Sequence, residues 1–390
     1  MAMKSLPPRP SRAPSRMTKV FCTGCGVVTP VGDTPEAVFL AVRAGRSALQ
    51  LYPAQPEPYM ASLLSREGFN GLSFFEHIAI EAARKAVAQA GLDPSGPRVG
   101  MVLSTIKGNV EQIDSEDVSL AAAATRIAAK LGVTSKPVVV SNACISGLAA
   151  LIQGMRMLRS GAYDHVIVVG AEVQSRFIVT GFQSLKALSL QACKPFDAAR
   201  DGLNLGEAAA AMVLRAEMPG QAGHDGVMAD TDRPSLWELV DGAVRNDANH
   251  ISGPSRTGEG SYNALKYLLP LVNREQLAFV NVHGTATRYN DEMEAIALER
   301  AGLLDVPVNA LKGIFGHTMG AAGILESIVS MQACDAGMVL PTQGFSELGV
   351  SRPVWVSAQE MSTHGTEFIK LLSGFGGVNG ALLFRKGGAR

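Results

Sequence analysis

The sequence has no excess of charge of either sign. It contains 35 Lys and Arg residues against 35 Asp and Glu residues, so the formal net charge at pH 7 is zero. Its cations are scattered rather than gathered in a basic stripe. Proteins that bind nucleic acid or an anionic membrane surface concentrate positive charge on one face. The composition therefore argues against both kinds of partner.

Long apolar runs are also missing. No stretch of 18 or more uncharged apolar residues occurs, so the sequence predicts no membrane-spanning helix. Residues 1–17, MAMKSLPPRPSRAPSRM, are rich in Pro, Ser and Arg and lack the apolar segment of a secretory signal. We expect them to form a disordered extension of a soluble, cytoplasmic protein.

Cysteine is scarce, and its five positions are scattered: Cys22, Cys25, Cys144, Cys193 and Cys334. An odd number at such spacing is not a disulfide framework, and it favours a reducing compartment. Cys22 and Cys25 form a CxxC pair within KVFCTGCGVVTPVG, which is typical of a strand entering a Gly/Pro turn. Because no second pair of ligands accompanies them, we expect no metal site.

Apolar residues make up 47% of the 390-residue chain and charged residues only 18%, which predicts a large buried core. Apolar β-branched runs at 98–105, 136–142 and 165–172 predict buried strands, and Ala-rich stretches at 75–91 and 120–132 predict helices. This alternation favours an α/β fold with a largely parallel sheet.

The chain divides into two halves with a faint internal similarity. A Gly-, Pro- and Asp-rich stretch at 217–236 separates residues 18–225 from residues 226–390. VVVSNACISGLAALIQGMRML in the first half and PVNALKGIFGHTMGAAGILESIVSMQ in the second each predict a strand, a polar turn and a helix of small residues. A duplicated α/β unit of this kind would place the polar groups of its two strand-to-helix turns face to face.

Cys144 lies between the strand and the helix of the first of these segments. A thiolate is the nucleophilic form of cysteine, and the unpaired N–H groups at a helix N-terminus favour that anion. Gly147 allows another backbone to approach the turn closely. The alternative is a buried structural cysteine, and this segment alone leaves both interpretations open.

Two histidines also follow predicted strands. FVNVHGTATRYNDEMEAIA (279–297) delivers His283 into a Gly-Thr turn with the hydroxyls of Thr285 and Thr287 just beyond it. NALKGIFGHTMGAAGILESI (309–328) places Lys312 and His317 on either side of a Gly-containing turn. A structural histidine and a surface lysine are the alternatives for these residues.

Three acidic residues accompany the histidines. Asp291 and Glu294 follow the first histidine turn, where we expect them to act as caps or structural anchors. Glu326 lies in an otherwise apolar helix and needs a buried partner.

LLSGFGGVNGALLF (371–384) predicts two strands around a Gly-rich loop that contains Phe375. It lacks the Lys-Ser/Thr ending of a phosphate-binding loop, so we expect it to offer backbone N–H groups to an oxyanion.

Together these segments resemble the β-ketoacyl-acyl carrier protein synthases of the thiolase superfamily, in particular the elongating Cys-His-His class. SNACISGL, HGTAT, KGIFGHTMGAAG and GFGGVNG are similar to the motifs of that family and follow its order over residues 18 to 386. The resemblance implies a thiolase fold, with duplicated α/β halves in a five-layered αβαβα arrangement, and a dimer.

The resemblance also implies roles for these residues. Cys144 would accept the acyl group, His283 and His317 would drive decarboxylation, and Lys312 would support His317 electrostatically. Backbone N–H groups of Cys144 and Phe375 would form the oxyanion hole. The expected substrate-binding set is Thr285, Thr287, Phe375 and Glu326, the last of these also holding a buried polar network together.

The implied reaction is the decarboxylative Claisen condensation of a Cys-bound acyl group with malonyl-acyl carrier protein, in fatty acid or polyketide/polyene biosynthesis. No cofactor is implied beyond the phosphopantetheine arm of the carrier protein. The implied partners are acyl carrier protein and a second subunit, either identical or ketosynthase-like.

The sequence departs from the common family pattern at ACIS, GEAAAAMVL and STIKGNV, which favours a type II polyketide or aryl-polyene synthase. Two other functions stay open at this point. A non-catalytic partner of the chain-length-factor type would lack the nucleophilic cysteine. A CoA-dependent thiolase would have a second cysteine where this chain has His317.

Overall fold

The computed structural model describes residues 18–53, 57–71, 73–113, 118–217 and 236–387. The predicted extension at 1–17 and the predicted boundary between residues 225 and 226 lie outside the described residues. Within them, no helix is both long and apolar enough to cross a membrane.

A ten-stranded sheet organises the described chain, in the order β11-β10-β14-β15-β9-β1-β8-β6-β4-β5. The strands of the first half are β1 (Val20–Val28), β4 (Val99–Ser104), β5 (Val138–Val140), β6 (His165–Glu172) and β8 (Ala208–Ala216). Those of the second half are β9 (Trp237–Asn246), β10 (Leu277–Asn281), β11 (Val308–Asn309), β14 (Glu367–Gly374) and β15 (Val378–Lys386).

The two halves repeat one topology. In each half, the first of the five strands pairs antiparallel with the fifth, and the fifth pairs antiparallel with the fourth. The fourth, second and third strands then lie side by side in that order and are parallel. The halves meet where β1 pairs with β9, at Phe21–Glu238 and Cys22–Trp237. The internal similarity seen in the sequence is therefore a structural duplication.

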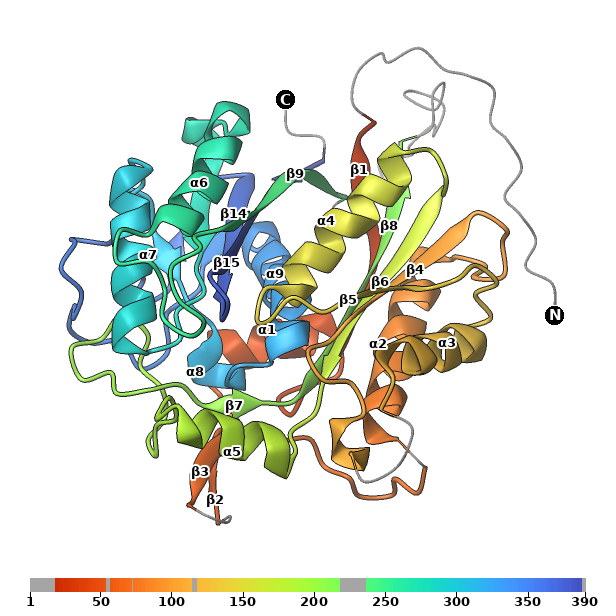
Figure 1. Ribbon diagram of the computed structural model, residues 1–390. Coiled ribbons are helices and arrows are strands. Elements are labelled where there is room, and N and C mark those ends of the chain that lie inside the picture. Colours follow the sequence, from red (N-terminus) through yellow and green to blue (C-terminus); the bar gives the residue numbers. More distant parts are fainter. Residues whose placement is uncertain (1–17, 54–56, 72, 114–117, 218–235, 388–390) are drawn as a thin grey trace.

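Helices form three layers around the two halves of the sheet (Figure 1). The outer layers are α2 (Phe74–Ala90) with α3 (Leu120–Leu131), and α6 (Glu259–Leu268) with α7 (Arg288–Arg300). The middle layer contains α4 (Ser146–Arg159) and α9 (Ala322–Asp335), each of which contacts strands of both halves, with α1 (Pro35–Arg43) beside α9. The expected five-layered αβαβα arrangement is confirmed. The prediction of a largely parallel sheet is wrong, because the first, fourth and last strands of each half pair antiparallel and β1 pairs antiparallel with β9.

Local signals explain where the helices begin and end. Ser73 and Ser119 lie at the N-caps of α2 and α3, where their side chains accept N–H hydrogen bonds, and Gly91 and Gly132 end the same helices in the left-handed region. The remaining elements are short strands, short helices and 3-10 turns. They are β2 (Gln50–Tyr52), β3 (Tyr59–Ser62), β7 (Leu205–Gly206), β12 (Met338–Val339), β13 (Met361–Ser362), α5 (Arg176–Ser184), α8 (Lys312–Phe315), η1 (Val110–Gln112), η2 (Leu269–Leu271), η3 (Arg274–Gln276) and η4 (Met319–Ala321).

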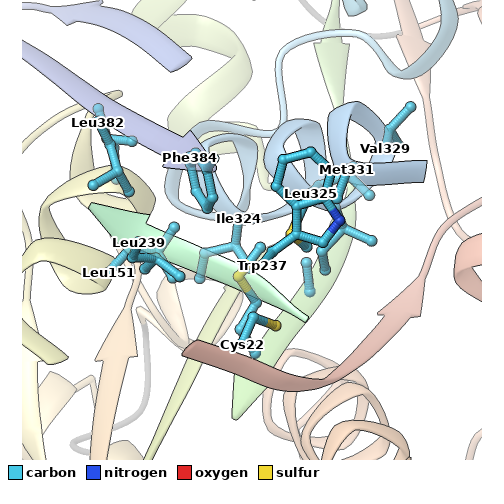
Figure 2. Packing of buried hydrophobic residues seen from close by; sticks show 14 of the residues in the cluster. Cys22, Leu151, Trp237, Leu239, Ile324, Leu325, Val329, Met331, Leu382 and Phe384 are labelled. Atoms are coloured by element: carbon cyan, nitrogen blue, oxygen red, sulfur yellow. The ribbon is translucent and has the colours of Figure 1, made fainter. Parts of the chain in front are cut away.

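The largest apolar cluster lies between the two halves of the sheet, around the middle helices (Figure 2). Leu151 of α4 and Ile324 of α9 contribute to it, and Trp237 packs edge-on against Phe368, with ring centroids 5.4 Å apart. Two further clusters lie beneath the outer helices, one in each half. Because the middle layer is shared, the ends of its helices are held from both sides, and the functional groups lie at those ends.

Candidate active site

Three separate turns bring a thiol and two imidazoles together. Cys144 lies between β5 and α4, His283 follows β10, and His317 lies between α8 and η4. The Cys144 sulfur and the ligand nitrogens of the two histidines all lie within 4.8 Å of one another. The two imidazole rings meet edge to face, with centroids 5.0 Å apart. Cys144 thus shares one reactive centre with two histidines of the second half of the chain.

The turn that carries Cys144 has an unusual backbone. Ala143 adopts φ +46°, a left-handed conformation that non-glycine residues rarely take. The Ser146 hydroxyl holds this turn, because it donates to the carbonyl of Ala143 at 2.6 Å and accepts from the N–H of Asn142 at 2.7 Å. Such strain at a turn is typical of functional sites. The turn directs the sulfur into a cavity rather than into the apolar core.

Burial controls the titration of Cys144, which is only 6% exposed. Burial raises the pKa of this thiol to about 11, whereas Lys312 and the backbone N–H groups of Phe375 and Cys144 lower it. We expected the helix N-terminus to favour the thiolate. The backbone N–H group of Cys144 does lower the pKa in this way, but the loss of hydration on burial outweighs it, so the net shift is upward.

Both imidazoles are neutral. Burial lowers the pKa of His283 and of His317 well below the ordinary value, and the charge of Lys312 lowers both further. The N–H of Met319 donates to Nδ1 of His317 at 3.2 Å, so the ring proton of that histidine lies on Nε2. Within the described residues, Nε2 of His317 and Nδ1 of His283 have no hydrogen-bond partner. His317 therefore offers an unused N–H donor beside the thiol.

Two buried carboxylates hold the turn after His283. Glu294 accepts from the N–H groups of His283 at 2.7 Å and Gly284 at 2.8 Å, and Asp291 accepts from the N–H of Thr285 at 3.0 Å. Burial raises the pKa of Glu294 to about 7 and that of Asp291 to about 6. The expected anchoring role of these two residues is confirmed.

Lys312 is a buried residue, not a surface one. It is 1% exposed, and its ammonium group donates to the carbonyl oxygen of His283 at 2.6 Å and to Glu326 at 2.8 Å. The second oxygen of Glu326 accepts from Lys370 at 2.6 Å. Burial would raise the pKa of Glu326, but the two lysines outweigh it and hold that pKa below its ordinary value. Glu326 thus has the buried partner that its position required.

The placement of Glu326 corrects one prediction. We expected it among the substrate-binding residues, but it lies behind the histidines and does not line the cavity. Sequence reasoning also missed Lys370. The signal was present, because Lys370 is the one charged residue between Phe368 and Leu372, in a strand buried on both faces.

A cavity of about 430 Å³ opens onto the reactive centre. Cys144, His283 and His317 line it, together with Thr285, Thr287, Phe375, Phe182, His250 and Ser252. The hydroxyls of Thr285 and Thr287 lie 2.9 Å apart, and the ring of Phe375 packs near that of Phe182 at 5.8 Å. The remaining predicted substrate-binding residues therefore face one space together with the thiol and both imidazoles.

Similar proteins are known. Residues 61–218 match the family model of the β-ketoacyl synthase N-terminal domain, and residues 236–346 match that of the C-terminal domain. The chain is 30% identical to the tetracenomycin polyketide synthase ketoacyl synthase alpha subunit of Streptomyces glaucescens, over 84% of this chain and 88% of that one. It is 29% identical to 3-oxoacyl-[acyl-carrier-protein] synthase 2 of Vibrio cholerae, over 94% and 99% of the two chains.

Among solved structures, a β-ketoacyl synthase from Burkholderia phymatum superimposes with a TM-score of 0.83 at 25% identity, over 96% of this chain and all of that one. The matches run through both halves and include the turns that carry Cys144 and both histidines. The chain belongs to the β-ketoacyl synthase family.

Proposed function

We propose that this protein is an acyltransferase that catalyses the decarboxylative Claisen condensation of a Cys144-bound acyl group with malonyl-acyl carrier protein, releasing a β-ketoacyl-acyl carrier protein. One observation carries the proposal: a thiol and two neutral imidazoles lie within 4.8 Å of one another at the end of a single cavity. The family relatives are named as 3-oxoacyl and polyketide synthases, which supports the same chemistry.

In the first half-reaction, the Cys144 sulfur attacks the thioester carbonyl of an acyl carrier protein. The S–C bond to the pantetheine thiol breaks, and the proton of Cys144 leaves with that thiol. The backbone N–H groups of Phe375 and Cys144 approach the sulfur and are placed to stabilise the negative oxygen of the tetrahedral intermediate.

In the second half-reaction, a malonyl thioester loses CO2 and leaves an enolate. A neutral imidazole with a free N–H stabilises the enolate oxygen without supplying an acidic proton, and His317 offers such a donor at Nε2. His283 lies on the other side of the same space. The enolate carbon then attacks the acyl-Cys144 carbonyl. The Cys144 sulfur leaves as a thiolate and takes up a proton from water, which regenerates the thiol.

We infer that the substrates arrive on phosphopantetheine and that the reaction needs no further cofactor. The hydroxyls of Thr285 and Thr287 lie along the cavity, where they can bind the amide groups of that arm. The sequence departures noted above and the polyketide relative favour a polyketide or polyene pathway. The five free cysteines support a cytoplasmic location.

We also propose a second ketosynthase-like subunit, either identical or related. In the described chain β5 is the last strand of the ten-stranded sheet, and it pairs only with β4. An unpaired edge of three valines is a surface that proteins usually cover. A solved ketosynthase from Xenorhabdus doucetiae with the same fold is in complex with its chain length factor.

The test is reconstitution with acyl- and malonyl-acyl carrier proteins, followed by intact-mass analysis of enzyme and product. The wild type should gain one acyl group and form a β-ketoacyl product with release of CO2. Cys144→Ala should lose both the acyl adduct and the product. Condensation that persists in Cys144→Ala would rule out the mechanism.

A further inference from the structure

Lys370 is a fully buried cation for which the reaction above assigns no role. It lies in the middle of β14 with 0% exposure. Its ammonium group donates to Glu326 at 2.6 Å, to the carbonyl of Val282 at 3.2 Å and to the carbonyl of Asn281 at 3.4 Å. An ammonium group is costly to bury, so three buried acceptors in one place indicate a specific use.

These contacts continue the ones made by Lys312. Lys312 binds the carbonyl of His283, so the two lysines together hold three consecutive carbonyl groups at the end of β10. Glu294 and Asp291 hold the N–H groups that follow. The backbone from residue 281 to residue 285 is therefore fixed by charged side chains on both its donor and its acceptor groups. The side chain of His283 extends from the middle of this segment.

The charges behind the histidines do not cancel. Lys312 from α8 and Lys370 from β14 share one carboxylate, Glu326 from α9. The other charged or titratable groups facing this region are Glu294 and Asp291 from α7, Arg200 beside Asp291, Glu172 from β6 and Cys144 itself. Burial raises the pKa of Glu294 and of Glu172 to about 7, so these carboxyls neutralise the second lysine only in part at neutral pH.

We propose that Lys370 is a positioning residue for the condensation: it fixes the turn that carries His283 and places a positive charge behind both imidazoles. This inference rests on the proposed function. Nothing in the reaction requires Lys370 to touch the substrate, since it lies behind the histidines and not in the cavity lining.

The electrostatics agree with this placement. Lys370 contributes to the lowered pKa of both His283 and His317, after burial and Lys312. Burial lowers the pKa of Lys370 itself to about 8, whereas Glu326 raises it, so the residue is charged at neutral pH. Removing this charge should raise the pKa of both imidazoles toward the ordinary value.

Neutral imidazoles matter because of the carbanion. An imidazolium beside the enolate would transfer its proton to carbon, which converts the malonyl group into an acetyl thioester instead of a condensed product. A neutral donor stabilises the enolate but retains its proton. The charge of Lys370 thus favours carbon–carbon bond formation over simple decarboxylation.

The experiment compares Lys370→Met, which keeps the length of the side chain without its charge, with Leu372→Met, an uncharged change at a buried position of the same strand. In Lys370→Met, the acidic limb of kcat/KM should move to higher pH, because removing a nearby positive charge makes the imidazolium easier to form. The ratio of acetyl- to β-ketoacyl-carrier protein at pH 6 should rise. Leu372→Met should change neither quantity.

An equal loss of activity at every pH, with the acidic limb and the product ratio unchanged, would show that Lys370 is only structural and would overturn the proposal. If Lys370→Met does not fold, Lys370→Gln provides a second test, because it keeps a hydrogen-bond donor to Glu326 without the charge. It should shift the acidic limb of kcat/KM in the same direction. Proton NMR titration of the wild-type imidazoles needs no lysine variant, with signals assigned through His283→Asn and His317→Asn. Imidazoles that titrate near pH 6.5 in the wild type would contradict the proposal even if condensation itself were absent.

Discussion

Gly147 of α4 and Gly323 of α9 lie directly against each other where the two middle helices cross. A Cβ atom on Gly323 would come within 2.3 Å of the backbone nitrogen of Leu148, and one on Gly147 within 2.8 Å of the carbonyl oxygen of Gly320. Since α4 follows Cys144 and α9 follows His317, this contact fixes the distance between the nucleophile and one of the imidazoles. The close backbone approach predicted for Gly147 and for the small-residue helix is confirmed.

Gly323→Ala should therefore destabilise the protein and impair the site. The clash is with backbone rather than with a flexible side chain, so we expect a loss of about 1–3 kcal/mol in unfolding free energy. Urea denaturation measures it. The control is Gly181→Ala in α5, where an added Cβ meets nothing within 4 Å. If both variants unfold at the same urea concentration, the crossing does not depend on the glycine pair.

The high pKa of Cys144 predicts an unusual alkylation profile. A thiol with a pKa of about 11 gains roughly tenfold in thiolate for each pH unit up to that value. The iodoacetamide rate at Cys144, followed by peptide mass analysis, should therefore rise throughout pH 7 to 9 without a plateau. Cys144→Ala identifies the signals of the other four cysteines. A plateau below pH 8 would mean that the resting nucleophile is already a thiolate.

His317→Ala should separate the two half-reactions. Loss of one oxyanion donor typically costs 10²–10³ in rate, so CO2 release from malonyl-carrier protein should fall by about that factor. Acyl transfer to Cys144 depends on the N–H groups of Phe375 and Cys144 and should fall by less than about tenfold. The exposed His364 provides the control variant, His364→Ala. Equal losses in both half-reactions would place His317 in acyl transfer as well.

Glu172 predicts a pH dependence of stability. Its carboxylate accepts from the N–H groups of Ile106 and Gly320 and from the hydroxyl of Thr105, and burial raises its pKa to about 7. Between about pH 4.5 and 7 the folded chain keeps a proton that the unfolded chain releases, so stability falls as pH rises through that window.

Glu172→Gln removes this titration. Its unfolding free energy should be lower than that of the wild type at pH 5 by about 1–3 kcal/mol, because its NH2 group faces N–H or O–H donors where Glu172 offers an oxygen. The difference should shrink at pH 7, because the wild type becomes less stable as the buried carboxyl of Glu172 loses its proton. Parallel urea titrations at the two pH values test this. A constant difference would show that Glu172 titrates at its ordinary pKa.

The reactive groups were predictable because each lies in a turn motif with its own characteristic residues, and Cys144 and His283 also come just after strands. The strand predicted at 165–172 and the helices predicted at 75–91 and 120–132 are confirmed, since an apolar β-branched run and Ala-rich stretches distinguish them. The electrostatics were not predictable. The pKa of Cys144 depends on what covers it, and the contacts of Lys370 depend on how β14 aligns with β10 across the sheet. A sequence shows a charge in a strand but not which carbonyl groups face it.

The order of the functional groups along the chain has a consequence for synthesis. Cys144 belongs to the first half, whereas His283, His317 and the N–H of Phe375 belong to the second, and α4 packs against strands of both. During translation the thiol leaves the ribosome well before any group that would activate it. Until the second half docks, the face of α4 that packs against β9, β15 and α9 stays uncovered, so the two halves must associate before the reactive centre exists.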